Sequence, residues 1–133
     1  MVVDTSALLA LFFGEPEAED FARAIAEAEV PRMSAANLLE AGIVADSQTD
    51  PRTGRQLDAL VASLHLRIEP VTERHARIAR QAYVDYGRGH HPAKLNFGDC
   101  FAYALAKATG EPLLFKGDDF GQTDIKASRP TGN

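Results

Sequence analysis

The sequence predicts a three-layer α/β/α sandwich around a central parallel sheet of four to five strands. Short apolar runs alternate along the chain with longer stretches whose apolar residues recur every three or four positions, which is the pattern of strands followed by helices. Strands that alternate with helices pair in parallel through right-handed crossovers. The chain has 133 residues, 45% hydrophobic and 25% charged, so we expect one globular domain spanning residues 1–133.

Apolar spacing and helix-ending residues set the expected elements of the first half of the chain. These elements are a strand at Met1–Val3, a helix at Ser6–Phe13, a helix within 15–30, a strand at Val30–Met33, a helix at 34–45 and a helix from Thr53 to Leu64. Gly14 and Pro16 end the first helix, and Ser34 can cap the third. Apolar residues on nearly every side of the 34–45 helix predict that it is buried.

The second half continues the alternation. Its expected elements are a weak strand at Leu66–Val71, a helix from the cap residue Thr72 to about Tyr86, a loop over 87–98, a helix from Asn96 or Gly98 to Gly110, a strand in "PLLFKGDDF", and one last short strand around Ile125. Phe97, Phe101 and Leu105 recur at one-turn spacing and predict an apolar face on the last long helix. Functional residues are expected where strands end, because ligands bind beyond the carboxyl ends of parallel strands.

Charge is unevenly distributed along the chain. The total is −5, but ten acids and two bases give residues 1–50 a net −8, four acids and eight bases give 51–98 a net +4, and five acids and four bases give 99–133 a net −1. The overall sign argues against a general nucleic-acid coat protein. The basic middle is either a solvated Arg-rich helix face or a surface that meets phosphate.

The single cysteine and the hydropathy pattern indicate the cellular compartment in which the protein is expected. One Cys excludes an internal disulfide and any cysteine-based zinc cluster, which agrees with a reducing environment. Cys100 is expected to be a small buried residue rather than a nucleophile. No run of about 20 apolar residues or signal peptide is found, so we expect a cytoplasmic protein that does not span a membrane.

Acidic residues stand at the expected strand ends and nearby helices. Asp4 ends the first strand, Glu40 lies in the 34–45 helix, Asp99 opens the last long helix, and Asp118 and Asp119 follow "PLLF". Each has a simple structural explanation as a cap, a turn residue or the polar edge of a helix. Together, converging carboxylates require a cation, and an all-oxygen site suits Mg²⁺ or Mn²⁺. One or two such ions could activate water for hydrolysis of a nucleic-acid phosphodiester.

Three stretches carry a more specific signal than any single acid: "VVDTSALLALFFGEPE", "SAANLLEAGIV" and "KLNFGDCFAYALAKATGEPLLFKGDDFGQTDI". In this order and spacing the sequence resembles, nearly end to end, the PIN-domain ribonucleases and specifically the VapC-type toxins of bacterial toxin–antitoxin pairs. The resemblance implies Mg²⁺-dependent endoribonuclease activity on RNA. It further implies inhibition by a cognate VapB-like antitoxin, which inserts a segment into the active-site groove, and a toxin homodimer.

The resemblance also assigns roles to particular residues. The first three acids of the family correspond to Asp4, Glu40 and Asp99, and the hydroxyl that hydrogen-bonds the metal-site carboxylates or their waters corresponds to Thr5 or Ser6. Many relatives have a fourth acid three residues before the Phe of the last motif. That position is Gly117 here, so the role passes to Asp118, with Asp119 as the substitute.

The loop before Asp99 and two rival functions complete the hypotheses. Arg88, His90, His91 and Lys94 are placed to contact RNA phosphate, although loop histidines are often merely exposed and adjacent histidines suit a metal poorly. A phosphatase of the haloacid dehalogenase type also has an early strand-end Asp, but it needs a second Asp two residues on, where this chain has Ser. The other rival is a catalytically silent module that binds metal and antitoxin.

Overall fold

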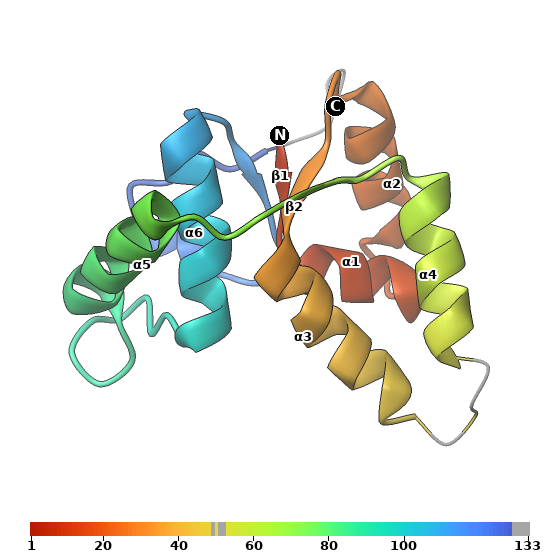
Figure 1. Ribbon diagram of the computed structural model, residues 1–133, viewed down its shortest axis with the longest axis horizontal. Helices are drawn as coiled ribbons and strands as arrows, with labels where there is room; N and C mark the ends of the chain where they lie inside the picture. Colours follow the sequence, from red (N-terminus) through yellow and green to blue (C-terminus); the bar gives the residue numbers. More distant parts are fainter. Residues whose placement is uncertain (49, 51–52, 129–133) are drawn as a thin grey trace.

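A computed structural model describes residues 1–48, 50 and 53–128, and within them the predicted sandwich is confirmed (Figure 1). Four parallel strands form one sheet in the order β3-β2-β1-β4. The strands are β1 (Val2–Val3), β2 (Arg32–Ser34), β3 (Arg67–Glu69) and β4 (Leu113–Leu114). The helices are α1 (Thr5–Phe12), α2 (Ala18–Glu27), α3 (Ala35–Asp46), α4 (Thr53–Ser63), α5 (Glu73–Tyr86), α6 (Phe97–Thr109) and the short 3₁₀ helix η1 (Phe120–Gln122).

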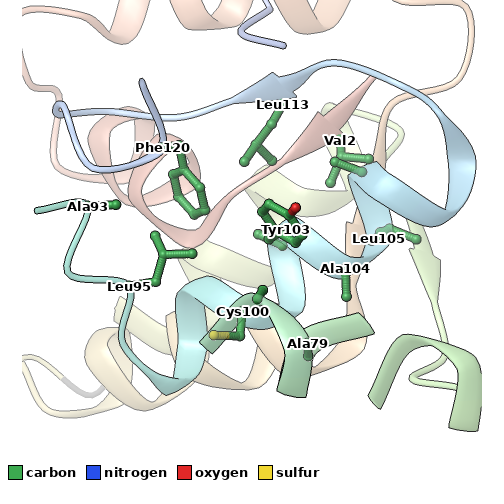
Figure 2. Packing of buried hydrophobic residues seen from close by; sticks show 13 residues of the cluster. Val2, Ala79, Ala93, Leu95, Cys100, Tyr103, Ala104, Leu105, Leu113 and Phe120 are labelled. Atoms are coloured by element: carbon green, nitrogen blue, oxygen red, sulfur yellow. The ribbon is translucent and has the colours of Figure 1, made fainter. Parts of the chain in front are cut away.

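The two faces of the sheet contribute side chains to two separate hydrophobic cores, because successive side chains of a strand point to opposite faces. Val2 and Leu113 pack with α5 and α6, while Val3 and Leu114 pack with the layer formed by α1 to α4. Figure 1 shows α5 and α6 on one side of the strands and the other four helices on the opposite side. Figure 2 shows the first core, in which residues of α6 lie between the sheet and α5.

Helix ends follow the sequence signals. The Ser34 hydroxyl accepts a hydrogen bond from Ala36 N, and the Thr72 hydroxyl accepts one from His75 N, so both predicted caps are confirmed. Asn96 caps α6. Gly110 ends that helix in the left-handed conformation, with φ at +71°, which glycine adopts without a steric penalty.

Helix α3 is less buried than its composition predicts. Asn37, Ala41 and Ala45 form its buried stripe, whereas Leu39 is 65% exposed and Ile43 is 60% exposed. The prediction of a buried helix was wrong because apolar composition does not distinguish residues that meet the domain core from residues left for another surface. Across the described residues, neither α3 nor any other helix is long and apolar enough to cross a membrane.

Two further expectations need correction. Phe97 does not join the core, since it is 79% exposed at the start of α6. The strand expected around Ile125 is reduced to an isolated bridge between Leu113 and Ala127. Two backbone hydrogen bonds, from Leu113 N to Lys126 O and from Ser128 N to Leu113 O, hold this segment beside β4, and the described sheet has four strands.

Candidate active site

Asp4 lies directly beyond β1, an interior strand of the sheet, and caps α1. Its side chain is almost fully buried, with 3% of the residue exposed. Oδ2 accepts hydrogen bonds from Ser6 N at 3.0 Å and Ser6 Oγ at 2.6 Å. Oδ1 is also buried and has no hydrogen-bond partner in the structure. One oxygen is therefore held by the protein, and the other is a buried acceptor that the protein leaves unsatisfied.

Electrostatics at Asp4 favour a cation. Burial raises the pKa of the Asp4 carboxyl from its ordinary value of 3.8 to about 7, the hydrogen bonds from Ser6 oppose that rise, and the charges of Asp99 and Glu40 add to it. The three carboxyl groups, which come from distant parts of the sequence, are thus close enough to repel one another. A bound cation would reverse this unfavourable interaction.

Glu40 is positioned by three segments of the chain. Its Oε1 accepts hydrogen bonds from Thr5 Oγ1 at 2.5 Å and from Asn37 Nδ2 at 3.3 Å. The same Asn37 amide donates to Gly98 O at 2.9 Å. A Cβ at Gly98 would lie within 3.0 Å of three atoms of the Glu40 carboxylate, so only glycine leaves this carboxylate in place. These contacts join the ends of α1, α3 and α6.

Asp99 combines a structural contact with a place in the acidic cluster. Its Oδ2 accepts a hydrogen bond from Asn96 N at 3.0 Å, and the Asn96 side chain accepts one from Asp99 N at 2.9 Å, which makes a capping box. Burial raises the pKa of Asp99, the Asn96 bond lowers it, the charges of Asp119 and Glu40 raise it, and Arg88 lowers it. Asp99 therefore does have the structural role of a helix cap, but that role does not account for the charged groups around it.

Asp118 and Asp119 are exposed in the turn after β4. Gly117, with φ at +95°, opens the turn, and their carbonyl groups accept hydrogen bonds from Gly121 N and Gln122 N. The charge that acts on Asp99 from this turn is that of Asp119. Asp119, the substitute in the sequence prediction, is therefore the acid of this turn that interacts with Asp99.

The two predicted hydroxyls both contact site carboxylates. Thr5 donates to Glu40, and Ser6 donates to Asp4 while its Oγ accepts a hydrogen bond from Lys116 N at 2.9 Å. Ser6 thereby links Asp4 to the segment that follows β4. A phosphatase of the haloacid dehalogenase type would need an acid at this position, and the structure instead uses it to orient Asp4.

The acids approach one another without forming a closed metal cage. Within residues 1–48, 50 and 53–128, no three His, Cys, Asp or Glu side chains stand as a ready metal-binding group. Mg²⁺ does not require one, since it keeps several waters and is commonly bound by one or two carboxylates together with substrate phosphate. The unpartnered Oδ1 of Asp4, together with the nearby carboxylates of Glu40 and Asp99, fits such an ion.

Sequence reasoning missed Asn37 and Gly98. Asn37 is completely buried and orients Glu40, and its own Oδ1 is a second buried oxygen without a partner. A polar residue one turn before an acid in an otherwise apolar helix is the signal that could have identified Asn37. Nothing local distinguishes Gly98, because its contact is made by a side chain 58 positions earlier.

The histidines of the 87–98 loop make local contacts. His90 Nε2 lies 2.8 Å from Tyr83 O, and His91 Nδ1 accepts a hydrogen bond from Ala93 N at 3.0 Å. Both bonds shape the loop, whereas Arg88 and Lys94 are exposed. A role for these four residues in binding RNA stays a prediction.

Cys100 is a buried residue of α6, as expected. It is 5% exposed and packs in the core between the sheet and α5 (Figure 2). Burial raises the pKa of its thiol to about 11, with a smaller contribution from the charge of Asp99. The thiol therefore stays protonated at neutral pH, which agrees with a packing role.

The acidic residues gather at the carboxyl end of β1 in a four-stranded parallel sheet, and known proteins match the chain that carries them. The model of the PIN domain family matches residues 1–126, and the chain therefore belongs to the PIN-domain family. Within this family it groups with the VapC ribonucleases. Ribonuclease VapC28 of Mycobacterium tuberculosis is 56% identical over 127 residues, which cover 95% of this chain and 96% of that protein.

Solved structures share the fold at lower identity. Mycobacterium tuberculosis VapC20, a Sarcin-Ricin loop cleaving toxin, superposes with a TM-score of 0.77 at 23% identity, covering 97% of this chain and 98% of that one. A chain of a toxin–antitoxin complex from Klebsiella pneumoniae gives a TM-score of 0.69 at 20% identity, covering 92% of each chain. At these identities the similarity concerns the fold alone.

Proposed function

We propose that this chain is a Mg²⁺-dependent endoribonuclease that acts as the toxin of a toxin–antitoxin pair. The observation that carries the proposal is the buried, unpartnered Oδ1 of Asp4, whose carboxyl has a pKa raised by burial and further by the charges of Asp99 and Glu40. The ribonuclease names of relatives that match nearly the whole chain support RNA as the substrate.

Asp4, Glu40 and Asp99 would hold the metal, with an acid of the 118–119 turn completing the set. Each of the three is oriented by a separate donor, namely Ser6 for Asp4, Thr5 for Glu40 and Asn96 for Asp99. The effect of Asp119 on Asp99 favours Asp119 over Asp118 as the fourth acid. Bound Mg²⁺, or Mn²⁺ in its place, would supply charge neutralisation and a lowered pKa of bound water at the phosphodiester.

The remaining residues serve orientation and substrate binding. Because hydrogen bonds already hold the carboxylates in place, these groups need little reorientation during the reaction, which lowers the activation free energy. Burial raises the pKa of Asp99, and the charge of Arg88 partly opposes that rise, so a phosphate drawn to Arg88 arrives beside the acids. Lys94 extends the same positive loop, while His90 and His91 shape it.

A cleavage assay on purified, partner-free protein tests this function. Labelled structured RNA is incubated with Mg²⁺ or with EDTA, and the wild type is compared with Asp4→Asn and Asp99→Asn. Asp58→Asn serves as the matched control, because Asp58 is exposed on α4. We expect cleavage only with Mg²⁺, in the wild type and the control. Cleavage that persists in EDTA or in both site variants contradicts the proposal, and Mg²⁺ binding without cleavage of any RNA favours the silent module.

A cognate VapB-like antitoxin and a homodimer are part of the same proposal. The structural neighbour from a toxin–antitoxin complex supports a protein partner. Leu39, Ile43 and Val71 line a cleft of about 560 Å³ that also borders Glu40, and these exposed apolar side chains suit a protein contact. Co-purification from the native host tests the partner, and light scattering of Ile43→Glu against the wild type tests self-association. RNA as substrate and a single buried cysteine support a cytoplasmic location.

A further inference from the structure

A second cleft shares the lining residues Phe97 and Phe101 with the cleft that borders α3. It has a volume of about 530 Å³, within the range of ~300–1,000 Å³ typical of small-ligand sites. Its main lining residues are Arg80 and Tyr83 of α5, Arg88 of the following loop, and Asn96, Phe97 and Phe101 at the start of α6. Asn96 caps α6 and exchanges two hydrogen bonds with Asp99, so this cleft opens beside the acidic site.

Charge distinguishes this cleft from the one that borders α3. Among the described residues, the charged ones that line it are Arg80 and Arg88, whereas the charged residue that lines the α3 cleft is Glu40. Neither arginine forms a salt bridge with any described residue, in contrast to Arg77 of the same helix, which pairs with Glu73. Two guanidinium groups without a salt bridge, beside the acidic residues, suit a polyanion that runs past those residues.

Three aromatic side chains, Tyr83, Phe97 and Phe101, also line the cleft. Phe97 is 79% exposed, although its ring contacts Phe101 edge-to-face with centroids 4.9 Å apart. Tyr83 is 40% exposed, and its hydroxyl lies 3.4 Å from Arg88 O. Exposed rings interleaved with arginines are the combination that binds single-stranded nucleic acid, since bases stack on the rings and phosphates meet the cations.

We propose that this cleft is a nucleotide subsite in which Phe97 stacks on an unpaired base of the RNA while Arg80 and Arg88 bind the flanking phosphates. The subsite deepens the proposed ribonuclease function and rests on it. Because Phe97 stands two residues before Asp99, a base held there fixes the position of the neighbouring phosphodiester at the acids. The enzyme would therefore select unpaired segments, whose bases are free to leave the stack.

Binding to single-stranded RNA that carries 2-aminopurine, measured in EDTA by anisotropy and fluorescence quenching, tests the subsite without catalysis. We expect Phe97→Ala to weaken binding about 5- to 150-fold and to remove the quenching, with no change in salt dependence. Phe97→Tyr should restore both. Arg80→Ala and Arg88→Ala should each reduce the salt slope by about one and keep the quenching. Phe13→Ala removes another exposed ring, and Arg77→Ala another arginine of α5, so both should behave as the wild type.

Equal RNA binding by Phe97→Ala and Phe13→Ala overturns the subsite. So does a Phe97→Ala variant that changes only the mass measured by light scattering, because Phe97 would then serve a protein contact. The two proposals fail separately. If quenching depends on Phe97 but the protein cleaves no RNA, the subsite stands and the nuclease proposal is refuted. If the wild type cleaves RNA but binding does not depend on Phe97, the nuclease proposal stands and the subsite is refuted.

Discussion

Asp4→Asn is expected to stabilise the metal-free protein at pH 8 while it removes the response to Mg²⁺. The carboxyl has a pKa of about 7 in the folded protein and an ordinary value of 3.8. A folded pKa that is raised means that the folded state binds the proton more tightly. The stability that this proton contributes is present below pH 3.8 and is lost as the pH rises through about 7.

The size of the effect follows from these two values. At pH 8 the charge on Asp4 costs the folded state at most about 4 kcal/mol, since each pKa unit is worth about 1.36 kcal/mol. Asn removes the charge and keeps an oxygen for Ser6, but its amide NH₂ replaces Oδ1 in a position without an acceptor, which costs about 1–3 kcal/mol. The net gain of about 1–3 kcal/mol corresponds to a rise in Tm of about 3–10 °C for a chain of this size.

Differential scanning fluorimetry in EDTA and in Mg²⁺, at pH 5 and pH 8, measures the effect. At pH 5 the folded wild type keeps most of the proton, so the advantage of Asn should shrink to about 1 kcal/mol or less. Mg²⁺ should raise the Tm of the wild type and of Asp58→Asn at pH 8 but leave Asp4→Asn unchanged. An Asn variant that melts below the wild type at pH 8 in EDTA, or that gains as much from Mg²⁺, would refute the reasoning.

Three further predictions concern the surroundings of the acids. Gly98→Ala should lower RNA cleavage by about 100-fold, because its Cβ displaces the Glu40 carboxylate, with little loss of Tm; Gly42→Ala, which meets nothing within 4 Å, is the control, and equal activity of the two variants would contradict the role. Thr5→Val should lower cleavage about tenfold through the lost hydrogen bond to Glu40, and Thr5→Ser should recover most of it; failure of Ser to do better than Val argues against the bond. Native Cys100 should resist a thiol reagent at pH 8 and react in denaturant, since burial raises its pKa to about 11; rapid native labelling would show the thiol to be accessible.

Local patterns account for most of the fold that the sequence predicts. Helix caps such as Ser34 and Thr72 act within three residues, and apolar periodicity acts within one helix, so both can be recognised in the sequence alone. The same patterns could not show that Leu39, Ile43 and Phe97 are exposed. The sequence around an apolar residue does not show whether its side chain faces the protein's own core or a partner, because the packing of the helices decides this.

The sequence by itself determined the strand–helix alternation, the position of Asp4 at the end of the first strand, and the family to which the chain belongs. Only the tertiary structure decided that Asp4 keeps a buried oxygen without a partner, that Asn37 orients Glu40, and that Asp119 is the acid acting on Asp99. The physical reason is the range of the interactions. Hydrogen bonds and repulsion in the site join residues far apart in the chain, and their strength depends on a burial that exists only once both layers of helices have packed against the sheet.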